Sequence, residues 1–224
     1  MMPYPIAVED YVKVVYAHTE WQPEPITTSV LAARLGLAAS SVTEMVKKLG
    51  AQGLVDHVPY GAVTLTADGT ALALRMLRRH RLIETWLVRH FGYGWDEVHD
   101  EAEVLEHSLS DRLLDRIDDE LGFPTRDPHG DPIPGRDGRV EQPAAELLRA
   151  VAAGETVRVV RISDRDPALL RHLEAEAIVL DGVFTVVSGD PFVVSVDGSQ
   201  RERTIAPDAL DSVWVSRERR GRVK

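Results

Sequence analysis

Acidic and imidazole side chains are interspersed with apolar ones in HDEAEVLEH, residues 99–107 of this 224-residue chain. Residues three and four positions apart share one face of an α-helix, so a helix here would project Glu103, Glu106 and His107 together. Carboxylates three residues apart repel each other, and a cation between them would remove that repulsion. The stretch is therefore either a solvated acidic face, the usual meaning of a charge run, or part of a metal site.

Two histidines stand four residues before a carboxylate, which places each pair on one helical face. The pairs are His80 with Glu84 and His99 with Glu103, and Asp10 adds a carboxylate near the start of the first expected helix. Singly, each is typical of a surface residue or of an ion pair within its own helix. Together they predict a site with only oxygen and nitrogen donors, whose candidate ligands are Asp10, His80, Glu84, His99, Glu103, Glu106 and His107.

The composition of the chain excludes several kinds of site. It has no cysteine, which rules out disulfides, thiolate–zinc sites and cysteine nucleophiles. The N-terminus lacks the basic and apolar regions of a signal peptide, and the apolar runs are too short to cross a membrane. We therefore expect a cytoplasmic protein without membrane attachment. Its net charge of −10 does not by itself decide whether it binds nucleic acid.

The first 70 residues have the pattern of a winged helix-turn-helix. Helical spacing over residues 7–20 is followed by a short helix that Thr27 or Thr28 can cap and that ends at Gly36. A second helix covers residues 38–49, and alternating residues around Tyr60-Gly61 predict two strands joined by a tight turn. The candidate DNA contacts are Ser40, Ser41, Thr43, Glu44, Lys47 and Lys48, with Tyr60 at the tip of the wing; a solvated helix face is the alternative.

The rest of the chain is helical at first and then rich in strands. The expected fold class is mainly α with a small all-β C-terminal module. We expect a DNA-binding domain at 1–72, a helical metal-binding and dimerisation domain at 73–142, a small β-barrel-like domain at 150–217 and a basic tail at 218–224. A stretch rich in Pro and Gly, residues 124–143, ends the second of these as a linker or ordered loop.

The sequence contains a series of motifs in a definite order: EDYV at 9–12, SSVTEMVKKL at 40–49, GLV at 53–55, LTADG at 65–69, RRHRLIE at 78–84, VHDEAEVLEHSLSD at 98–111 and GDPIPG at 130–135. With these motifs the chain resembles the diphtheria-toxin-repressor family of metal-dependent repressors, in its manganese-responsive branch. The resemblance runs from about residue 7 to 135 and is specific in motif order and spacing. The β-rich end is similar in kind to the family's SH3-like third domain, with a weak match at the level of residues.

The resemblance implies two metal sites in each protomer. Asp10, Glu103, Glu106 and His107 match the primary site, and His80, Glu84 and His99 match the ancillary site. The iron-responsive branch has sulfur ligands where this chain has Asp10 and Glu103, and hard oxygen ligands favour Mn(II) over Fe(II). Asp131, Asp164 and Asp166 are further candidate ligands from the loop and the third domain.

Two departures from the family pattern concern neighbouring positions. Lys13 stands where shorter manganese repressors have a glutamate, which argues against a two-metal cluster of their type. Asp127 and Asp131 fall where relatives hold an anion beside Arg81, and their negative charge argues against such an anion here.

The implied function is that of a homodimeric, Mn(II)-dependent repressor that binds a palindromic operator in double-stranded DNA. It would have no enzymatic activity and no small-molecule substrate, and metal would hold the dimer in its DNA-binding geometry. The alternatives are an Fe(II)-responsive repressor of the same family, a winged-helix regulator independent of metal, and a metalloenzyme. Metal-dependent DNA binding without turnover would separate these classes.

Overall fold

The computed structural model describes residues 4–58, 61–196 and 202–218, and the chain divides into two units. The first unit comprises residues up to His80 together with 106–109 and 134–140. The second comprises residues 81–105, 110–133 and the chain from Glu141 onward. Helices dominate the first half of the chain and strands the second, which confirms the expected fold class.

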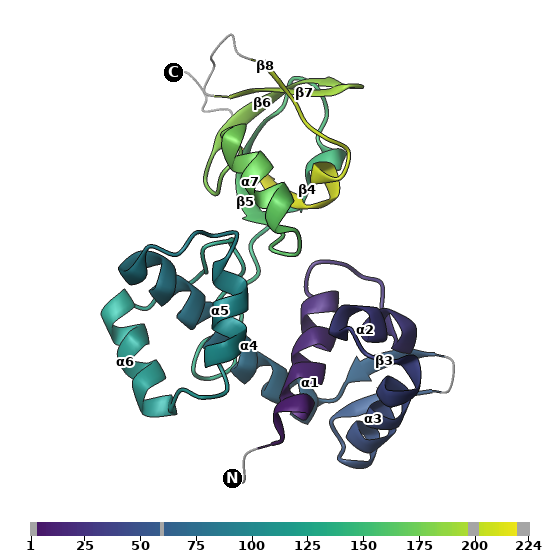
Figure 1. Ribbon diagram of the computed structural model, residues 1–224. Coiled ribbons are helices and arrows are strands. Elements are labelled where there is room, and N and C mark those ends of the chain that lie inside the picture. Colours follow the sequence, from purple (N-terminus) through teal and green to yellow (C-terminus); the bar gives the residue numbers. More distant parts are fainter. Residues whose placement is uncertain (1–3, 59–60, 197–201, 219–224) are drawn as a thin grey trace. The chain divides into compact units, whose positions relative to one another are not determined.

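The first unit is a winged helix-turn-helix, as the sequence predicts (Figure 1). Its three short strands form an antiparallel sheet in the order β1-β3-β2. Its elements are α1 (Ile6–Thr19), β1 (Ile26–Thr27), α2 (Thr28–Leu35), α3 (Ala39–Ala51), β2 (Val55–His57), β3 (Ala62–Leu65) and the start of α4 (Ala67–Phe91).

The turn between α2 and α3 follows from local chemistry. The Thr27 side chain accepts a hydrogen bond from the backbone N–H of Val30 at 3.3 Å and so caps the start of α2. Gly36 ends the helix at φ +64°, a left-handed conformation that glycine adopts without strain. The following helix α3 buries one apolar face in the core of the unit through Val42, Val46 and Leu49.

Helix α4 contributes residues to both units. Its 25 residues begin directly after the wing strand β3, and it contains no proline. Residues through His80 belong to the first unit and those from Arg81 to the second. Because 3.6 residues make one turn, the consecutive residues Arg79, His80 and Arg81 point in different directions, and Glu84 lies about one turn after His80.

The second unit continues with two helices, α5 (Val98–Leu105) and α6 (Asp111–Leu121). Ser110 caps α6 by accepting from the N–H of Leu113 at 3.2 Å, and Gly122 ends it at φ +75°. Helix α6 is amphipathic, with Leu114 and Ile117 among its buried residues.

The C-terminal part of this unit is a six-stranded antiparallel sheet in the order β4-β9-β5-β6-β7-β8 (Figure 1). Its buried apolar residues form one core with those of α7. This confirms the predicted β-rich C-terminal module, which also contains the short helix α7. The elements are β4 (Glu146–Leu147), the 3-10 turn Leu148–Ala150, β5 (Thr156–Ile162), α7 (Pro167–Ala175), β6 (Val183–Gly189), β7 (Phe192–Val196), β8 (Glu202–Thr204), the 3-10 turn Ala209–Asp211 and β9 (Val213–Arg217).

The stretch rich in Pro and Gly is an ordered loop in its central part rather than a linker. Asp127 and residues 129–134 are buried. The N–H of Asp127 donates to the carbonyl of Asp131 at 3.0 Å, and Arg126 forms a β-bridge with Pro132. The buried backbone is thus hydrogen-bonded within the loop itself, as burial of polar groups requires.

Within the described residues, no single helix is both long and apolar enough to cross a membrane. The bent pair α2 and α3 passes that test jointly by length and composition.

Candidate metal sites

The first candidate site, called the α1 cluster here, gathers Asp10, Glu106 and His107 in the first unit. Ligand atoms of these three residues lie within 4.8 Å of one another. The His107 imidazole has Nε2 at 2.9 Å from Asp10 Oδ1 and 3.3 Å from Glu106 Oε1. Its Nδ1 lies 3.0 Å from Glu9 Oε2, so a second carboxylate of α1 also reaches this imidazole. The donor set is three carboxylates and one imidazole, which suits a hard divalent cation.

Glu106 and His107 are positioned by a turn and not by a helical face. Helix α5 ends at Leu105, so the predicted helical projection of Glu103, Glu106 and His107 to one side is wrong. The guanidinium of Arg79 on α4 donates to the carbonyl of Glu106 at 2.8 Å and also to that of Leu109. These tertiary hydrogen bonds satisfy carbonyls that a continuing helix would have used.

The carboxylate of Glu106 is completely buried and is held by two partners, Lys13 and His80. Lys13 Nζ lies 2.5 Å from Oε1, and His80 Nδ1 lies 2.6 Å from Oε2. Burial alone would raise the pKa of Glu106, but His80 and Lys13 outweigh it and hold this pKa below its usual value. We therefore include Lys13, His80 and Glu9 in the α1 cluster. In this cluster Lys13 supplies a cation that belongs to the chain itself.

A second candidate site, called the α5 cluster here, gathers Glu84, His99 and Asp164 in the second unit. His99 Nδ1 lies 3.4 Å from Glu84 Oε1 and 3.2 Å from Asp164 Oδ2. Burial alone would lower the pKa of His99, but hydrogen bonds and charge from Asp164 and Glu84 raise it to about 11. A protonated imidazole thus sits between two carboxylates from distant parts of the chain.

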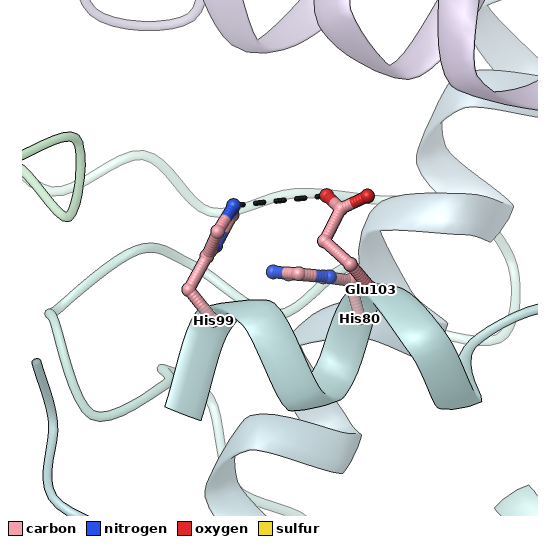
Figure 2. A group of neighbouring side chains, drawn as sticks. All are labelled: His80, His99 and Glu103. Carbon is pink, nitrogen blue, oxygen red and sulfur yellow. Dashed lines mark ion pairs between the residues drawn. The ribbon is translucent and has the colours of Figure 1, made fainter. Parts of the chain in front are cut away.

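Glu103 pairs with His99 on the same helix. Figure 2 shows the two side chains together on α5, with a dashed line for their ion pair. Glu103 Oε1 lies 3.7 Å from His99 Nε2. The spacing of four residues predicts this pair. Both side chains are 41% exposed, so the pair is in contact with solvent.

The three further candidate ligands have different surroundings. Asp164 reaches His99, as described. Asp166 instead caps α7, where its carboxylate accepts from the N–H groups of Ala168 at 2.9 Å and Leu169 at 3.2 Å. Asp131 is buried and accepts from Arg161 Nε at 2.8 Å. Among the described residues, neither Asp166 nor Asp131 belongs to a group of convergent ligand atoms.

Arg81 contacts two aspartate carboxylates in its surroundings. Its guanidinium lies 3.7 Å from Asp127 Oδ2 and 3.6 Å from Asp131 Oδ1, and it donates to the carbonyl of Pro132 at 2.6 Å. The arginine is only 4% exposed. The negative charges that it meets are therefore supplied by the chain.

The candidate DNA contacts lie on the outer face of α3. The exposed ones are Ser40, Ser41, Glu44, Lys47 and Lys48. Lys47 forms an ion pair with Glu44 at 2.7 Å, and Thr43 donates to the carbonyl of Ala39 in its own helix at 2.8 Å. Tyr60, predicted at the tip of the wing, lies outside the described residues.

Three family descriptions match the chain in succession. Residues 7–63 match the N-terminal DNA-binding domain of iron-dependent repressors, and residues 66–135 match their metal-binding and dimerisation domain. Residues 147–217 match the FeoA domain.

Individual relatives agree with these matches. An uncharacterised helix-turn-helix transcriptional regulator of Methanocaldococcus jannaschii is 38% identical over 111 residues, 50% of this chain and 89% of that protein. The iron-dependent repressor IdeR of Mycobacterium tuberculosis is 34% identical over 159 residues, 68% of this chain and 69% of that protein. The solved structure of a manganese-dependent transcriptional repressor in complex with manganese is 48% identical, with a TM-score of 0.90, over 94% of this chain and 100% of that one. The chain therefore belongs to the iron-dependent repressor family, the metal-dependent DNA-binding transcriptional repressors that include the diphtheria toxin repressor.

Proposed function

We propose that this protein is a manganese sensor, a repressor that binds its operator when Mn(II) is held at the α1 cluster. The observation that carries the proposal is the convergence of Asp10, Glu106 and His107 to within 4.8 Å. Oxygen and imidazole donors without sulfur suit Mn(II), which binds most weakly of the first-row divalent ions and depends on hard ligands. The similarity to a manganese-dependent repressor solved with manganese supports the same metal.

The proposed ligands come from two functional segments. Asp10 lies in the segment that matches the DNA-binding domain, and Glu106 and His107 lie in the segment that matches the metal-binding and dimerisation domain. A bound cation would supply a bond between these segments and would neutralise carboxylates that otherwise repel one another. By linkage, operator binding then raises the affinity for metal by the same factor as metal raises the affinity for the operator.

The geometric consequence concerns a dimer on DNA. A dimeric repressor must present two recognition helices about 34–36 Å apart, or a multiple of that distance, to reach successive major grooves. We propose a homodimer that reads a palindromic operator with α3, using Ser40, Ser41 and Thr43 near bases and Lys47 and Lys48 near phosphates. Restricting the movement of α1 by metal favours the dimer geometry that fits this spacing.

The α5 cluster is proposed as the second site, with Glu84, His99 and Asp164 as ligands. His80 stays a predicted ligand of this site on the resemblance alone, because its hydrogen bond in the structure is with Glu106. Two Mn(II) ions per protomer follow. Glu103 stays a predicted ligand of the first site on the resemblance alone, because its ion pair in the structure is with His99. The proposed domains are those of the sequence analysis, with boundaries at residues 72, 142 and 150, and we expect no catalytic turnover.

The alternative within the family is an Fe(II)-responsive repressor. It is supported by the 34% identity to an iron-dependent repressor. The absence of cysteine from the chain weighs against it, since soft sulfur ligands favour metals later in the first-row series.

The experiment is fluorescence anisotropy on DNA duplexes selected from a random pool by the protein, in parallel with Mn(II) and with chelator. Binding is then titrated with Mn(II), anoxic Fe(II) and Zn(II). Asp10→Asn removes a proposed ligand charge, and Glu24→Gln, an exposed acid outside both clusters, is the matched control. We expect Mn(II)-dependent binding that Asp10→Asn abolishes and Glu24→Gln preserves. Equal binding in chelator would contradict any metal dependence, and activation by Fe(II) alone would establish the alternative.

A further inference from the structure

Glu9 reaches the α1 cluster on a different side of the His107 ring from the other carboxylates. Its Oε2 lies 3.0 Å from His107 Nδ1. Asp10 Oδ1 and Glu106 Oε1 instead lie 2.9 Å and 3.3 Å from Nε2. The two nitrogens of an imidazole are distinct and point to different sides of the ring, so Glu9 does not face an ion that Nε2 would bind. Among the described residues, the convergent group of ligand atoms accordingly contains Asp10, Glu106 and His107 without Glu9.

The position of Glu9 differs from that of an ordinary acid in the first turn of a helix. Such an acid is favourable there through the partial positive charge of the helix N-terminus and needs no tertiary partner. Glu9 instead has a side chain only 18% exposed, and it contacts a histidine whose side chain is 12% exposed. That histidine lies 98 positions further along the chain, so the contact is a tertiary one.

Consecutive residues of α1 hold the His107 ring at both of its nitrogens. At 3.6 residues per turn, the side chains of Glu9 and Asp10 leave the helix about 100° apart, which lets them reach different edges of one ring. The turn that carries His107 is held separately, because Arg79 donates to the carbonyl of Glu106 at 2.8 Å. Rotation of the ring is the freedom that remains, and the contact with Glu9 restricts it.

The chemistry of a metal-binding histidine gives this contact a purpose. An imidazole binds an ion through the lone pair of one nitrogen, and its other nitrogen then carries the proton. In metal sites that N–H is almost always donated to a carboxylate, a carbonyl or water, which fixes the tautomer and the ring orientation and raises the basicity of the ligand. An ionised carboxylate accepts hydrogen bonds and cannot donate them, so Glu9 favours the tautomer with the proton on Nδ1.

We propose that Glu9 is a positioning residue of the α1 cluster, which accepts the Nδ1–H of His107 and thereby directs the lone pair of Nε2 at the cation held with Asp10 and Glu106. The inference rests on the proposed function, because it concerns the same metal site. Glu9 is then not a ligand, and the site keeps its ion without it, at lower affinity. Loss of such an outer partner of a metal-binding histidine typically lowers metal affinity about 10- to 100-fold.

The first test measures the affinity and the number of bound Mn(II) ions in the full-length protein, by calorimetric titration against a competing chelator. Glu9→Ala removes the acceptor, whereas Glu9→Gln keeps an amide oxygen that can accept the same N–H. Glu24→Ala, at an exposed position outside both clusters, removes the same charge and is the matched control.

We expect Glu9→Ala to bind as many ions as wild type, with one site weakened about 10- to 100-fold. Glu9→Gln should recover most of that affinity, and Glu24→Ala should match wild type. Loss of an ion from both Glu9 variants would make Glu9 a ligand, and wild-type affinity in Glu9→Ala would leave it without a role at the metal. Either result overturns the inference.

A second measurement uses the wild-type protein and so does not depend on the folding of a variant. With histidine labelled with ¹⁵N, saturating diamagnetic Zn(II) should shift the Nε2 resonance of His107 and leave its Nδ1 protonated. The same assignment should hold in Glu9→Gln. Zn(II) bound at Nδ1 would contradict the proposed orientation of the ring.

The two proposals fail in distinguishable ways. If Asp10→Asn loses an ion while Glu9→Ala binds as tightly as wild type, the role of Glu9 is refuted and the sensor site stands. If Asp10→Asn keeps every ion and the His107 ring does not respond to Zn(II), the α1 cluster is not a metal site, and the proposed function falls together with the inference that rests on it.

Discussion

The α1 cluster and the α5 cluster neutralise their carboxylates in different ways. In the α1 cluster, the ammonium of Lys13 lies 2.5 Å from the buried carboxylate of Glu106. In the α5 cluster, the His99 imidazole stands between Glu84 and Asp164. A lysine is a cation at neutral pH without any partner, whereas the His99 imidazole is one because Asp164 and Glu84 raise its pKa to about 11. A metal ion at the proposed sites would therefore compete with the ammonium of Lys13 at one cluster and with a proton on His99 at the other.

The largest effect is expected from breaking the ion pair of the α1 cluster. Glu106→Gln leaves the ammonium of Lys13 buried without its carboxylate, so the free energy of unfolding should fall by about 3–5 kcal/mol. Urea unfolding of the metal-free protein measures this change. Glu103→Gln, which breaks the ion pair of Glu103 with His99 of the α5 cluster, is the matched control, and this half-exposed pair should contribute less than about 1 kcal/mol. Equal losses in the two variants would remove the distinction between the clusters.

The second prediction concerns competition between Lys13 and metal. Lys13→Met removes a positive charge that repels a divalent cation and occupies Glu106, so Mn(II) should bind at least about tenfold more tightly, about 1.4 kcal/mol. Calorimetric titration against a competing chelator measures the affinity. Lys48→Met, an exposed lysine on α3, should leave it unchanged. Weaker binding in Lys13→Met would show that the lysine supports the site rather than competing for it.

A third prediction separates two neighbouring aspartates. Asp166→Ala removes the cap of α7 and should lower the free energy of unfolding by about 1 kcal/mol, with no change in Mn(II) affinity. Asp164→Ala should weaken Mn(II) binding, because it removes a carboxylate beside His99. Thermal unfolding and metal titration of both variants check the pair. A reversed result would exchange their roles.

The smallest effect is the pH dependence of the α5 cluster, because His99 is 41% exposed and solvent screens its charge. The pKa of His99 rises from 6.5 to about 11 in the folded protein. Its stabilisation is thus fully present below pH 6.5 and is lost as the pH rises from 6.5 towards 11. We expect the melting temperature of the metal-free wild type to fall more steeply over this range than that of His99→Gln. Parallel curves would refute a charged His99.

Local signals in the sequence account for much of the fold. The glycine turn at Gly36 and the hydroxyl cap at Thr27 act within a few residues, so the helix-turn-helix is predictable from them. The pair His99 and Glu103 follows from helical spacing in the same way. The cap of α7 also has a local signal in the sequence, because Asp166 stands directly before a proline. From the sequence alone, the same carboxylate is equally compatible with a metal ligand.

The parts that could not be predicted depend on contacts between distant residues. The local sequence VLEHSL does not indicate that α5 ends at Leu105. The end of the helix depends on a distant residue, because Arg79 of α4 donates a hydrogen bond to the carbonyl of Glu106 in the turn that follows α5. The contact of Glu9 with His107 joins residues 98 positions apart in the chain. Its only local signal was the neighbouring Asp10.

The glycine in the loop after α6 has a consequence for genetics. Gly130 adopts φ +95°, and a Cβ there would lie 2.1 Å from the carbonyl oxygen of Val160, so any side chain would displace the loop, although Gly130 has no side chain that could be a ligand. A saturation screen for unregulated transcription should therefore recover almost every substitution at this codon, as it would at a ligand. Alleles at the two kinds of position would differ in dose response, because excess metal in the medium can compensate for a weakened ligand but cannot restore a misplaced loop.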